Sequence, residues 1–431
     1  MHAKLAPRLI PALIAIAFSG VASASGFQLQ NQNASGTSVA FAGAAAVAED
    51  ASTIFFNPAG MTYLPMGHSI SVAGTVISRS VKFNDAGTGR MPVINPLTGG
   101  PTGATHPLGD NGGDGGGNSL VPAMYYSYAV TPALRLGLGL SATYGSETEY
   151  DDNFIGRFSG RATSIHQMNV NPSVAYKVNE MVSLGFGLNY AKNEIEFKQT
   201  SFVVGAPHAT LEGKDSSWGY NLGAMFQLTP ETRLGVSYRS AIKFDLEGKQ
   251  TIAALNVDRQ ILAKLETPDS FSLALSQKIG NQFELLADAT WTGWSSINAL
   301  TPTVASTGAA ASAPLRYNFK DAWRFGLGGK YQLNDALSLR AGLAFDKTPV
   351  PDDQSRTMTV PDSDRTWLSF GARWNVVKNA SLDFGYAHIF FKDVSTARDV
   401  KTTNEAVTLQ TVRGDFKTKA DLLSVQMNYN F

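Results

Sequence analysis

Two cations, Arg316 and Lys320, lie in the stretch "RYNFKDAWRFGLG" and could hold an acidic ligand. From Trp323 onward this stretch alternates large apolar residues with small or charged ones, as a strand with one apolar face does. Extending the alternation backwards places both cations on the polar face. A carboxylate that enters an apolar pocket loses water, and a cation offsets that loss. We therefore expect Arg316 and Lys320 to bind a substrate carboxylate, unless they pair with inward carboxylates such as Glu284 or Asp288.

Residues that could support catalysis or hold a metal are poorly spaced. Beyond the first residues the histidines are His68, His106, His166, His208 and His388. No two of them have the spacing of a metal-binding pair. His388 falls on an apolar parity, which leaves His166 as the one strand histidine that could assist a serine. With no cysteine, thiolate sites are excluded, so we expect no enzyme, no metal and no cofactor.

Overall charge argues against nucleic acid as a partner. Lys and Arg number 35, Asp and Glu number 35, and there is no basic run. The first 24 residues indicate export instead. Lys4 and Arg8 precede an apolar stretch from residue 9 to 18, and Ala22-Ser23-Ala24 has the form of a cleavage site. We predict a signal peptide over residues 1–24, the alternative being a buried N-terminal helix. No later apolar run reaches the ~18 residues of a membrane helix.

Alternation with a period of two recurs along the rest of the chain. The last residues, "LLSVQMNYNF", place Leu423, Val425, Met427, Tyr429 and Phe431 on one parity and polar residues on the other. An apolar strand face is stable in lipid only when the strand edges are paired in a closed barrel. We count fourteen such strands between His68 and Phe431. A soluble β-sandwich is the competing fold, but the polar parity here is small and charged, as in a wet lumen.

Connection lengths also alternate. Six short connections, such as "VTPAL" and "LNDALSL", are separated by long polar ones near residues 83–118, 146–162, 199–214, 248–266, 294–318, 347–363 and 393–420. Short turns at one end and long loops at the other are typical of bacterial outer-membrane barrels. We therefore predict an all-β chain, a 14-stranded antiparallel transmembrane β-barrel over residues 68–431. Its surroundings would be lipid and lipopolysaccharide of a Gram-negative outer membrane.

Residues 25–67 do not alternate. Their content of Ala, Ser and Gly is high, "SVAFAGAAAVAEDAS" could form a short helix, and Pro58 forces a turn in "FFNPAG". The segment could be a periplasmic tail or a plug inside the barrel. Fourteen strands enclose a lumen too wide for wall side chains to fill, so we predict an N-terminal hatch that plugs it.

Several motifs resemble the long-chain fatty-acid transporter family of the FadL/TodX type. These are "SGFQL" at residue 25, "FFNPAGM" at 55, "YNFKDAWRFGLG" at 317 and "PDSDRTWLS" at 361. The resemblance runs from residue 25 to Phe431. It implies passive transport of hydrophobic molecules, long-chain fatty acids or aromatic hydrocarbons, across the outer membrane. Extracellular loops would capture the substrate, an interior pocket would bind it, and movement of the hatch would release it sideways between strands.

The same resemblance implies roles for particular residues. Asn57, Pro58 and Ala59 match the family's hatch motif, and Phe27 matches a residue beside the interior pocket. The aromatic Phe431 on the last strand resembles the signal read by the barrel-insertion machinery. The family's carboxylate clamp is altered in this chain. Leu315 and Phe197 occupy its two basic positions, each followed by a cation, Arg316 and Lys198. An uncharged substrate therefore remains an alternative to a carboxylate, and Lys198 is a further candidate for substrate binding.

Trp367 falls on the lumen parity of its strand, where it could line an apolar pocket or pack on the hatch. Two loops also carry apolar residues. These are "SFVVGAPHATL" and residues 249–265, in which Ile252, Leu255 and Ile261 recur at roughly helical spacing. Exposed apolar surface on a loop usually marks a binding site. We therefore expect these two loops to form a groove that captures the substrate, unless they only pack on each other. A general porin for hydrophilic solutes and a structural or adhesive barrel are the alternative functions.

Overall fold

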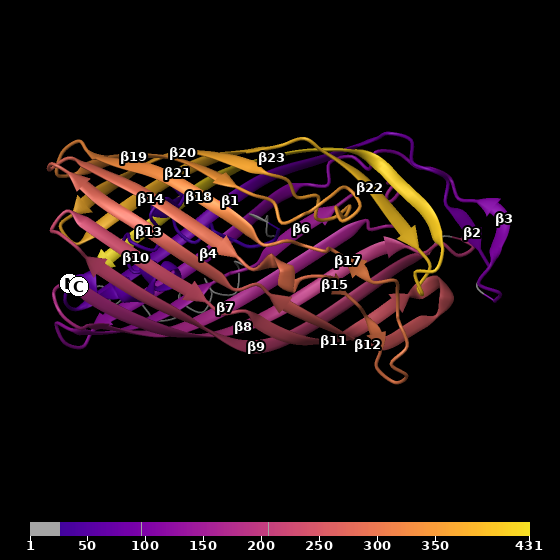
Figure 1. Cartoon of the computed structure of the whole chain (residues 1–431), viewed down its shortest axis with the longest axis horizontal. Coiled ribbons are helices and arrows are strands. Elements are labelled where there is room, and N and C mark those ends of the chain that lie inside the picture. Colours follow the sequence, from indigo (N-terminus) through magenta and orange to yellow (C-terminus); the bar gives the residue numbers. More distant parts are fainter. Residues whose placement is uncertain (1–25, 96, 206) are drawn as a thin grey trace, which may run out of the picture.

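The computed structural model describes residues 26–95, 97–205 and 207–431, so the expected signal peptide lies outside the described residues. Antiparallel strands form a closed barrel, shown in Figure 1. The ring closes where β1 (His68–Asp85) pairs with β23 (Thr408–Asn430), in a register that sets Ser69 opposite Asn430. The predicted barrel of fourteen antiparallel strands is confirmed.

The other twelve wall strands follow in chain order, five of them as two pieces separated by a kink or a break. They are β4 (Gly117–Ala129), β5 (Leu134–Ser141) with β6 (Gly145–Glu149), β7 (Ala162–Lys177), β8 (Val182–Thr200), β9 (His208–Gln227), β10 (Thr232–Arg239) with β11 (Ile242–Ile252), β12 (Val257–Thr267) with β13 (Ser270–Ile279), β14 (Phe283–Thr292) extended by β16 (Thr303–Val304), β18 (Ala322–Gln332), β19 (Leu337–Asp346), β20 (Arg365–Val377) and β21 (Ala380–Phe391) with β22 (Val394–Lys401).

Outside the wall the described elements are short. Two small two-stranded sheets pair β2 (Pro92–Ile94) with β3 (Pro101–Thr105) and β15 (Ala299–Leu300) with β17 (Leu315–Arg316). The helices are α2 (Ala34–Thr37), α3 (Thr53–Phe56), η1 (Pro58–Tyr63), η2 (Ala253–Leu255) and η3 (Trp294–Ser296). None of these helices is long and apolar enough to cross a membrane.

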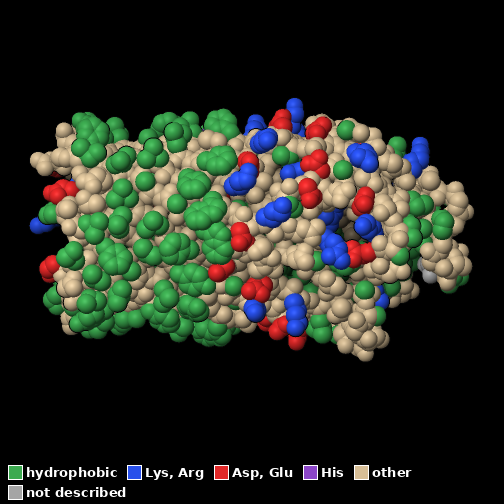
Figure 2. All heavy atoms as spheres, viewed as in Figure 1, with side chains coloured by type: hydrophobic (Ala, Val, Ile, Leu, Met, Phe, Trp, Pro, Cys, Tyr) green, Lys and Arg blue, Asp and Glu red, His purple; other side chains and the backbone are tan. Residues whose placement is uncertain are grey.

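The apolar parity of the strands faces outward, as the alternation predicted. Leu423 is 60% exposed and Met427 is 52% exposed, whereas Ser424 and Gln426 between them are buried. Figure 2 shows these side chains gathered in a broad apolar zone toward the end with the short turns, and charged residues beyond it. An apolar band of this kind on a closed barrel is the surface that contacts lipid.

Two segments differ from what their local residue spacing indicated. Residues 249–265 have no helix beyond the one turn of η2; they form the β11–β12 hairpin, so strands extend well past the apolar band. Residues 38–52 form turns instead of a helix, because Ala40 and Phe41 take left-handed φ angles of 50° and 58°. In both places, pairing or packing with the barrel wall determines the backbone conformation, and the local spacing of apolar residues does not.

The N-terminal segment, residues 26–67, packs against the inward face of the strands. Gly185 of β8 faces it so closely that an added Cβ would lie 2.3 Å from the Ala59 nitrogen. At Gly235 of β10 an added Cβ would lie 1.9 Å from the Ala45 oxygen. Glycine on the inward parity thus marks the places where this segment touches the wall.

The wall is interrupted between β5 and β6. In the described residues β4 pairs with β5 as far as Leu140, and no ladder pair joins β4 to β6. The N-terminal segment bridges this break: Leu29 N donates to Thr143 O at 2.8 Å, and Gly145 N donates to Phe27 O at 2.8 Å. A piece of the N-terminal segment therefore completes the wall at this point.

Candidate functional site

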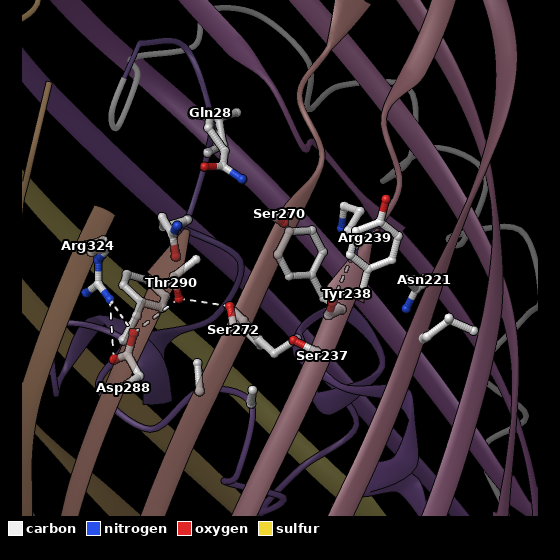
Figure 3. A pocket seen from close by; sticks show the side chains of 18 residues that line it. Gln28, Asn221, Ser237, Tyr238, Arg239, Ser270, Ser272, Asp288, Thr290 and Arg324 are labelled. Carbon is white, nitrogen blue, oxygen red and sulfur yellow. Dashed lines mark hydrogen bonds and ion pairs between the residues drawn. The ribbon is translucent and has the colours of Figure 1, made fainter. Parts of the chain in front are cut away.

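An interior chamber lies between the N-terminal segment and strands β9, β10, β13, β14 and β18 (Figure 3). Its volume is about 60 Å³, which exceeds the roughly 10–15 Å³ that one water needs. Strand residues form its polar side: Asn221, Ser237, Arg239, Ser270, Ser272, Asp288, Thr290 and Arg324. Phe41, Phe55 and Phe56 of the N-terminal segment form an apolar side. The chamber is therefore amphipathic.

Two arginines of the chamber have different partners. Arg324 is paired with Asp288, with Nη1 3.1 Å from Oδ2, and also donates to the Ala40 carbonyl. Arg239 donates to Asn189 Oδ1 at 2.7 Å and to Phe55 O at 2.8 Å, and its guanidinium lies 4.6 Å from the centre of the Phe55 ring. The charge of Arg324 is neutralised by a carboxylate, and that of Arg239 is held by neutral groups.

Phe27 lies in an aromatic cluster next to the break in the wall. Its ring contacts Tyr144 and Trp294 edge to face, at centroid distances of 5.9 and 5.2 Å. Gly26 N donates to Asp362 Oδ2 at 3.2 Å, which ties the segment to the loop before β20. Phe27 is buried in this cluster and is not among the residues that line the chamber.

An open groove of about 410 Å³ lies at the end with the long loops. Both loops expected to form a capture groove contribute to it, through Phe202 and Val203 and through Ile252 and Leu255. Arg316 lines the groove and pairs with Glu405, with Nε 2.7 Å from Oε1. Beside the groove, the lining residues Ala311 and Leu315 pack with an apolar cluster of Phe197, Leu211, Ile261 and Val304.

The Asn57-Pro58-Ala59 motif joins the N-terminal segment to the wall. The buried Asn57 amide donates to Ala45 O at 2.7 Å, to Ala224 O at 3.1 Å and to Val236 O at 3.3 Å. Its Oδ1 accepts from Ala59 N, which caps the helix η1 that begins at Pro58. One side chain thus connects two parts of the segment to β9 and β10.

Glu49 and Asp50 attach the same segment to the opposite wall. Glu49 pairs with Arg340 at 2.7 Å, with Arg373 at 3.2 Å and with Lys330. Asp50 pairs with Arg373 at 3.2 Å. Since these three cations come from β18, β19 and β20, the two acids connect the segment to three neighbouring strands.

The other expected binding residues lie elsewhere. The expected inward orientation of Lys320 is wrong, because it is exposed and lies before β18, whereas the neighbouring Phe319 is buried. Lys198 is half-buried and pairs with Glu196 at 2.7 Å, and it does not line the groove; Phe197 points inward in its place. Trp367 is fully buried and packs edge to face on Phe41 of the N-terminal segment, at 6.3 Å.

The chamber residues Arg239 and Asn221 were not predicted as site residues. Arg239 shares the parity of Arg233, Gly235 and Ser237 in "TRLGVSYR", so its inward orientation could be read from the sequence. Its position in the chamber depends on the N-terminal segment, which no periodicity predicts. The described residues contain no group of three or more His, Asp or Glu side chains arranged for a metal.

Comparisons with known proteins agree with this architecture. The family profile described as outer membrane protein transport protein (OMPP1/FadL/TodX) matches residues 15–431. The chain is 28% identical to outer membrane protein P1 of Haemophilus influenzae, with 96% of each chain covered. It is also 28% identical to the long-chain fatty acid transport protein of Escherichia coli K12, over 86% of this chain and 88% of that protein.

Among solved structures, a FadL homologue of Pseudomonas aeruginosa superposes with a TM-score of 0.82 at 23% identity. The match covers 94% of this chain and 100% of that one, and it supports the fold. Relatives over nearly the whole length are outer membrane proteins, so the barrel spans the outer membrane of a Gram-negative bacterium. The chain therefore belongs to the OMPP1/FadL/TodX family of outer-membrane transport proteins.

Proposed function

We propose that the protein is a passive channel for hydrophobic molecules, long-chain fatty acids or aromatic hydrocarbons, without catalysis. The observation that carries the proposal is the bridge between the N-terminal segment and the interrupted wall. Gln28 pairs with Tyr144 at the break between β5 and β6. Residues 26–67 act as a hatch, and substrate held inside leaves sideways through the break when the bridge opens.

The path begins at the extracellular groove, where Phe202, Ile252 and Leu255 offer apolar surface for capture. It continues along the apolar cluster around Phe197 to Phe27 and the chamber. An apolar solute gains about 25 cal/mol for each Å² of surface removed from water, so no energy source is needed for entry. Exit into the outer membrane keeps the solute in an apolar environment.

The chain's lack of cysteine makes a direct test possible. We would replace Gln28 and Tyr144 with cysteine and oxidise the pair to lock the bridge. Locking should abolish uptake of labelled oleate and toluene, and a reductant should restore it. Leu343→Cys with Leu368→Cys is the matched control, because these residues are register partners in β19 and β20, and Leu343 faces outward, away from the N-terminal segment and the break. Normal uptake by the locked protein would refute sideways release at this break.

A planar-bilayer measurement separates this function from a general porin. A barrel plugged by residues 26–67 should show little ion conductance, together with uptake of the hydrophobic probes. Large, steady conductance without uptake of either probe would instead support a hydrophilic pore. The absence of both ion conductance and probe uptake would favour a structural or adhesive barrel.

We further propose two contacts for the outer surface. Lys82 and Lys417 are register partners and both are exposed. Like charges directly opposite are destabilising, so a phosphate of lipopolysaccharide would stabilise this pair. At the other end Phe431 is 57% exposed and stacks on His68 and Tyr429, where the barrel-insertion machinery could bind it.

A further inference from the structure

The barrel wall has a second irregular joint, between β9 and the kinked strand formed by β10 and β11. β9 pairs with β10 as far as Asn221, and it pairs with β11 again from Lys214. Between these points, in the described residues, no ladder pair joins residues 215–220 of β9 to residues 240–246 of the neighbouring strand. We call this stretch the seam. The neighbouring strand has one residue more than β9 across the seam, as at a β-bulge.

Side chains replace part of the missing backbone pairing at the seam. Ser240 N donates to Tyr220 O at 2.9 Å, and Ser240 Oγ accepts from Tyr220 N at 2.9 Å. Asp215 Oδ2 accepts from Asp245 N at 2.8 Å. A barrel wall in a membrane normally satisfies its backbone by strand pairing. The seam is therefore held by fewer backbone bonds than the regular ladders above and below it.

The edge of β9 at the seam is more accessible than the strand on its other side. Asp215, Ser217 and Gly219 share the lumen parity of β9, and each of them is half-buried. On β8 the register partners of the first two, Asn193 and Ala191, are 0% exposed on the same lumen face. Because the lumen face is covered here, the exposure on β9 arises at its unpaired edge. The seam is therefore a place where the wall is loosely closed.

Apolar side chains lie on both sides of the seam. Inside, Ile242 and Phe244 are buried in the apolar cluster that contains Phe27. Outside, Trp218 is 62% exposed, and its ring lies 5.0 Å from that of Tyr190. Tryptophan and tyrosine are enriched where the apolar band of a membrane protein meets the polar layer. A hydrophobic molecule in the outer leaflet therefore meets an apolar surface outside the seam and another one behind it.

The hairpin next to the seam has a bending point at the same level. Its two strands are interrupted together, directly after Arg239 and directly before Ser270 (Figure 3). Beyond this level β11 and β12 pair with each other along their whole length. On the far edge of the hairpin, the described ladder pairs of β12 with β16 are those of Ile261 and Leu262. Bending at the interruption would open the seam and leave the hairpin intact.

We propose that the seam is a second lateral passage, through which hydrophobic molecules dissolved in the outer leaflet enter the barrel without passing the extracellular groove. Ile242 closes the passage on the inside, because an added Cβ at Gly219 would lie only 2.7 Å from Ile242 Cγ1. Apolar molecules leave water for lipid, so this route takes the substrate from the place where it accumulates. The proposal rests on the proposed transport function and adds a route of entry to it.

A disulfide across the seam tests the proposal. Gly219→Cys with Ile242→Cys suits this purpose, because the close approach of the two residues brings their Cβ atoms near the ~3.5–4.5 Å that a disulfide needs. Phe186→Cys with Leu222→Cys is the matched control, since these outward register partners tie β9 to β8 and leave the seam free. Each full-length variant is reconstituted in lipid vesicles after its heat-dependent gel mobility has shown a folded barrel.

Two probes separate the two routes of entry. A diazirine-bearing octadecane is dissolved in the vesicle lipid and photoactivated, and mass spectrometry compares its attachment to the interior Phe244 and to the lipid-facing Met427. Oxidation of the seam pair should reduce attachment to Phe244 at least about tenfold, because an S–S bond of ~2.05 Å leaves no gap between the strands. Attachment to Met427 should not change, and a reductant should restore the interior signal. Uptake of labelled oleate delivered from water should stay the same, as should both signals in the control pair.

The Gln28→Cys, Tyr144→Cys pair distinguishes the seam from the break between β5 and β6. When that pair is oxidised, the membrane-dissolved probe should still reach Phe244. Loss of the interior signal with the break locked, and no loss with the seam locked, would refute the seam as a passage.

Two further results would also overturn the proposal. An equal loss of interior labelling and of water-delivered oleate uptake in the seam-locked barrel would show that the seam only supports the common interior path. A wild-type barrel that takes up oleate from water and is not labelled at Phe244 from the membrane would refute the seam and leave the proposed transport intact. If the wild type shows neither signal, the transport proposal itself is refuted, and the seam passage with it.

Discussion

The side-chain amide of Asn57 donates a hydrogen bond to the backbone carbonyl of Ala224, 3.1 Å away in the barrel wall. The same amide reaches Val236 on the neighbouring strand. Asn57, which caps the N-terminus of helix η1, is thereby fastened to two wall strands. This relationship gives the hatch a defined position and gives a mutation there a defined effect.

Asn57→Ala should impair hydrophobic uptake without reducing the amount of folded barrel. The substitution removes an NH2 group whose two hydrogens are shared among three carbonyls. At about 0.5–1.5 kcal/mol for each of two hydrogen bonds, the attachment of the segment would weaken by about 1–3 kcal/mol. Uptake of labelled oleate is measured beside the amount of heat-modifiable barrel in the membrane. Asn281→Ala, in an exposed turn, is the control. Normal uptake by the Asn57 variant would show that these bonds do not matter for gating.

Gly185→Ala should destabilise the folded protein. Its new methyl group would lie 2.3 Å from the Ala59 nitrogen, so either hatch or wall has to shift. Overpacking of this kind costs about 1–3 kcal/mol. Gly74→Ala is the matched wall control, because its methyl group would meet nothing closer than 3.7 Å. Urea unfolding in lipid vesicles should separate the two variants, and equal stabilities would contradict the close fit.

Glu49→Gln should loosen the hatch more than an exposed charge removal does. Glu49 pairs with Arg340, Arg373 and Lys330, and its loss leaves buried cations without part of their compensation. Breaking one side of a buried pair typically costs about 3–5 kcal/mol. Glu180→Gln breaks an exposed pair with Lys177 and should cost less than about 1 kcal/mol. The checks are unfolding midpoints and protease access to residues 26–67, and similar values for the two variants would refute the anchoring role.

Acid should open the Arg316–Glu405 pair only well below neutral pH. The hydrogen bond from Arg316 holds the pKa of the Glu405 carboxyl below its ordinary value. Because the pKa of Glu405 is lower in the folded protein, the ion pair contributes fully to stability above the ordinary glutamate pKa of about 4.3. This contribution is lost as the pH falls through the lower folded value. The Arg316 Nε resonance followed by NMR should therefore titrate below about pH 4.3. Titration near neutrality would contradict the pairing.

Glu405→Gln should strengthen capture of oleate at the groove. The substitution removes the carboxylate that competes for Arg316, so a ligand carboxylate can bind that cation directly. We expect oleate capture to increase severalfold and oleyl alcohol capture to stay unchanged. Arg316→Met should abolish the gain. A gain for both ligands would indicate a change of groove shape instead of released charge.

The sequence predicted the barrel more completely than the site. Alternation with period two is sufficient to orient Met427 outward and Gln426 inward, because strand geometry leaves only two faces. The alternation does not extend to Lys320, which was predicted to face the lumen and is exposed. Asn318 takes a left-handed φ of 48°, and the irregular stretch before Ala322 breaks the parity. Periodicity holds only while the backbone stays extended.

The sequence could predict that residues 25–67 form no wall strand, and it could not predict the conformation of this segment. Ala40 and Phe41 lie in a segment of high helix propensity, yet both take positive φ angles as the segment packs against the wall glycines. The chamber around Arg239 is a product of the same packing, since the hatch supplies its apolar side. The positions of the chamber residues therefore depend on contacts between segments that are far apart in the sequence.

The closure of β1 on β23 has a consequence for the permeability of the outer membrane. Gln426 of the closing strand accepts hydrogen bonds from Ala34 and Ser35 of the hatch, so the strand that seals the ring also fastens the plug. Pairing with β1 and attachment of the N-terminal segment therefore share a residue of β23, Gln426. In the folded barrel the attached segment therefore occupies lumen beside the closing strand, where polar toxic solutes such as antibiotics and bile salts would otherwise find a water-filled path.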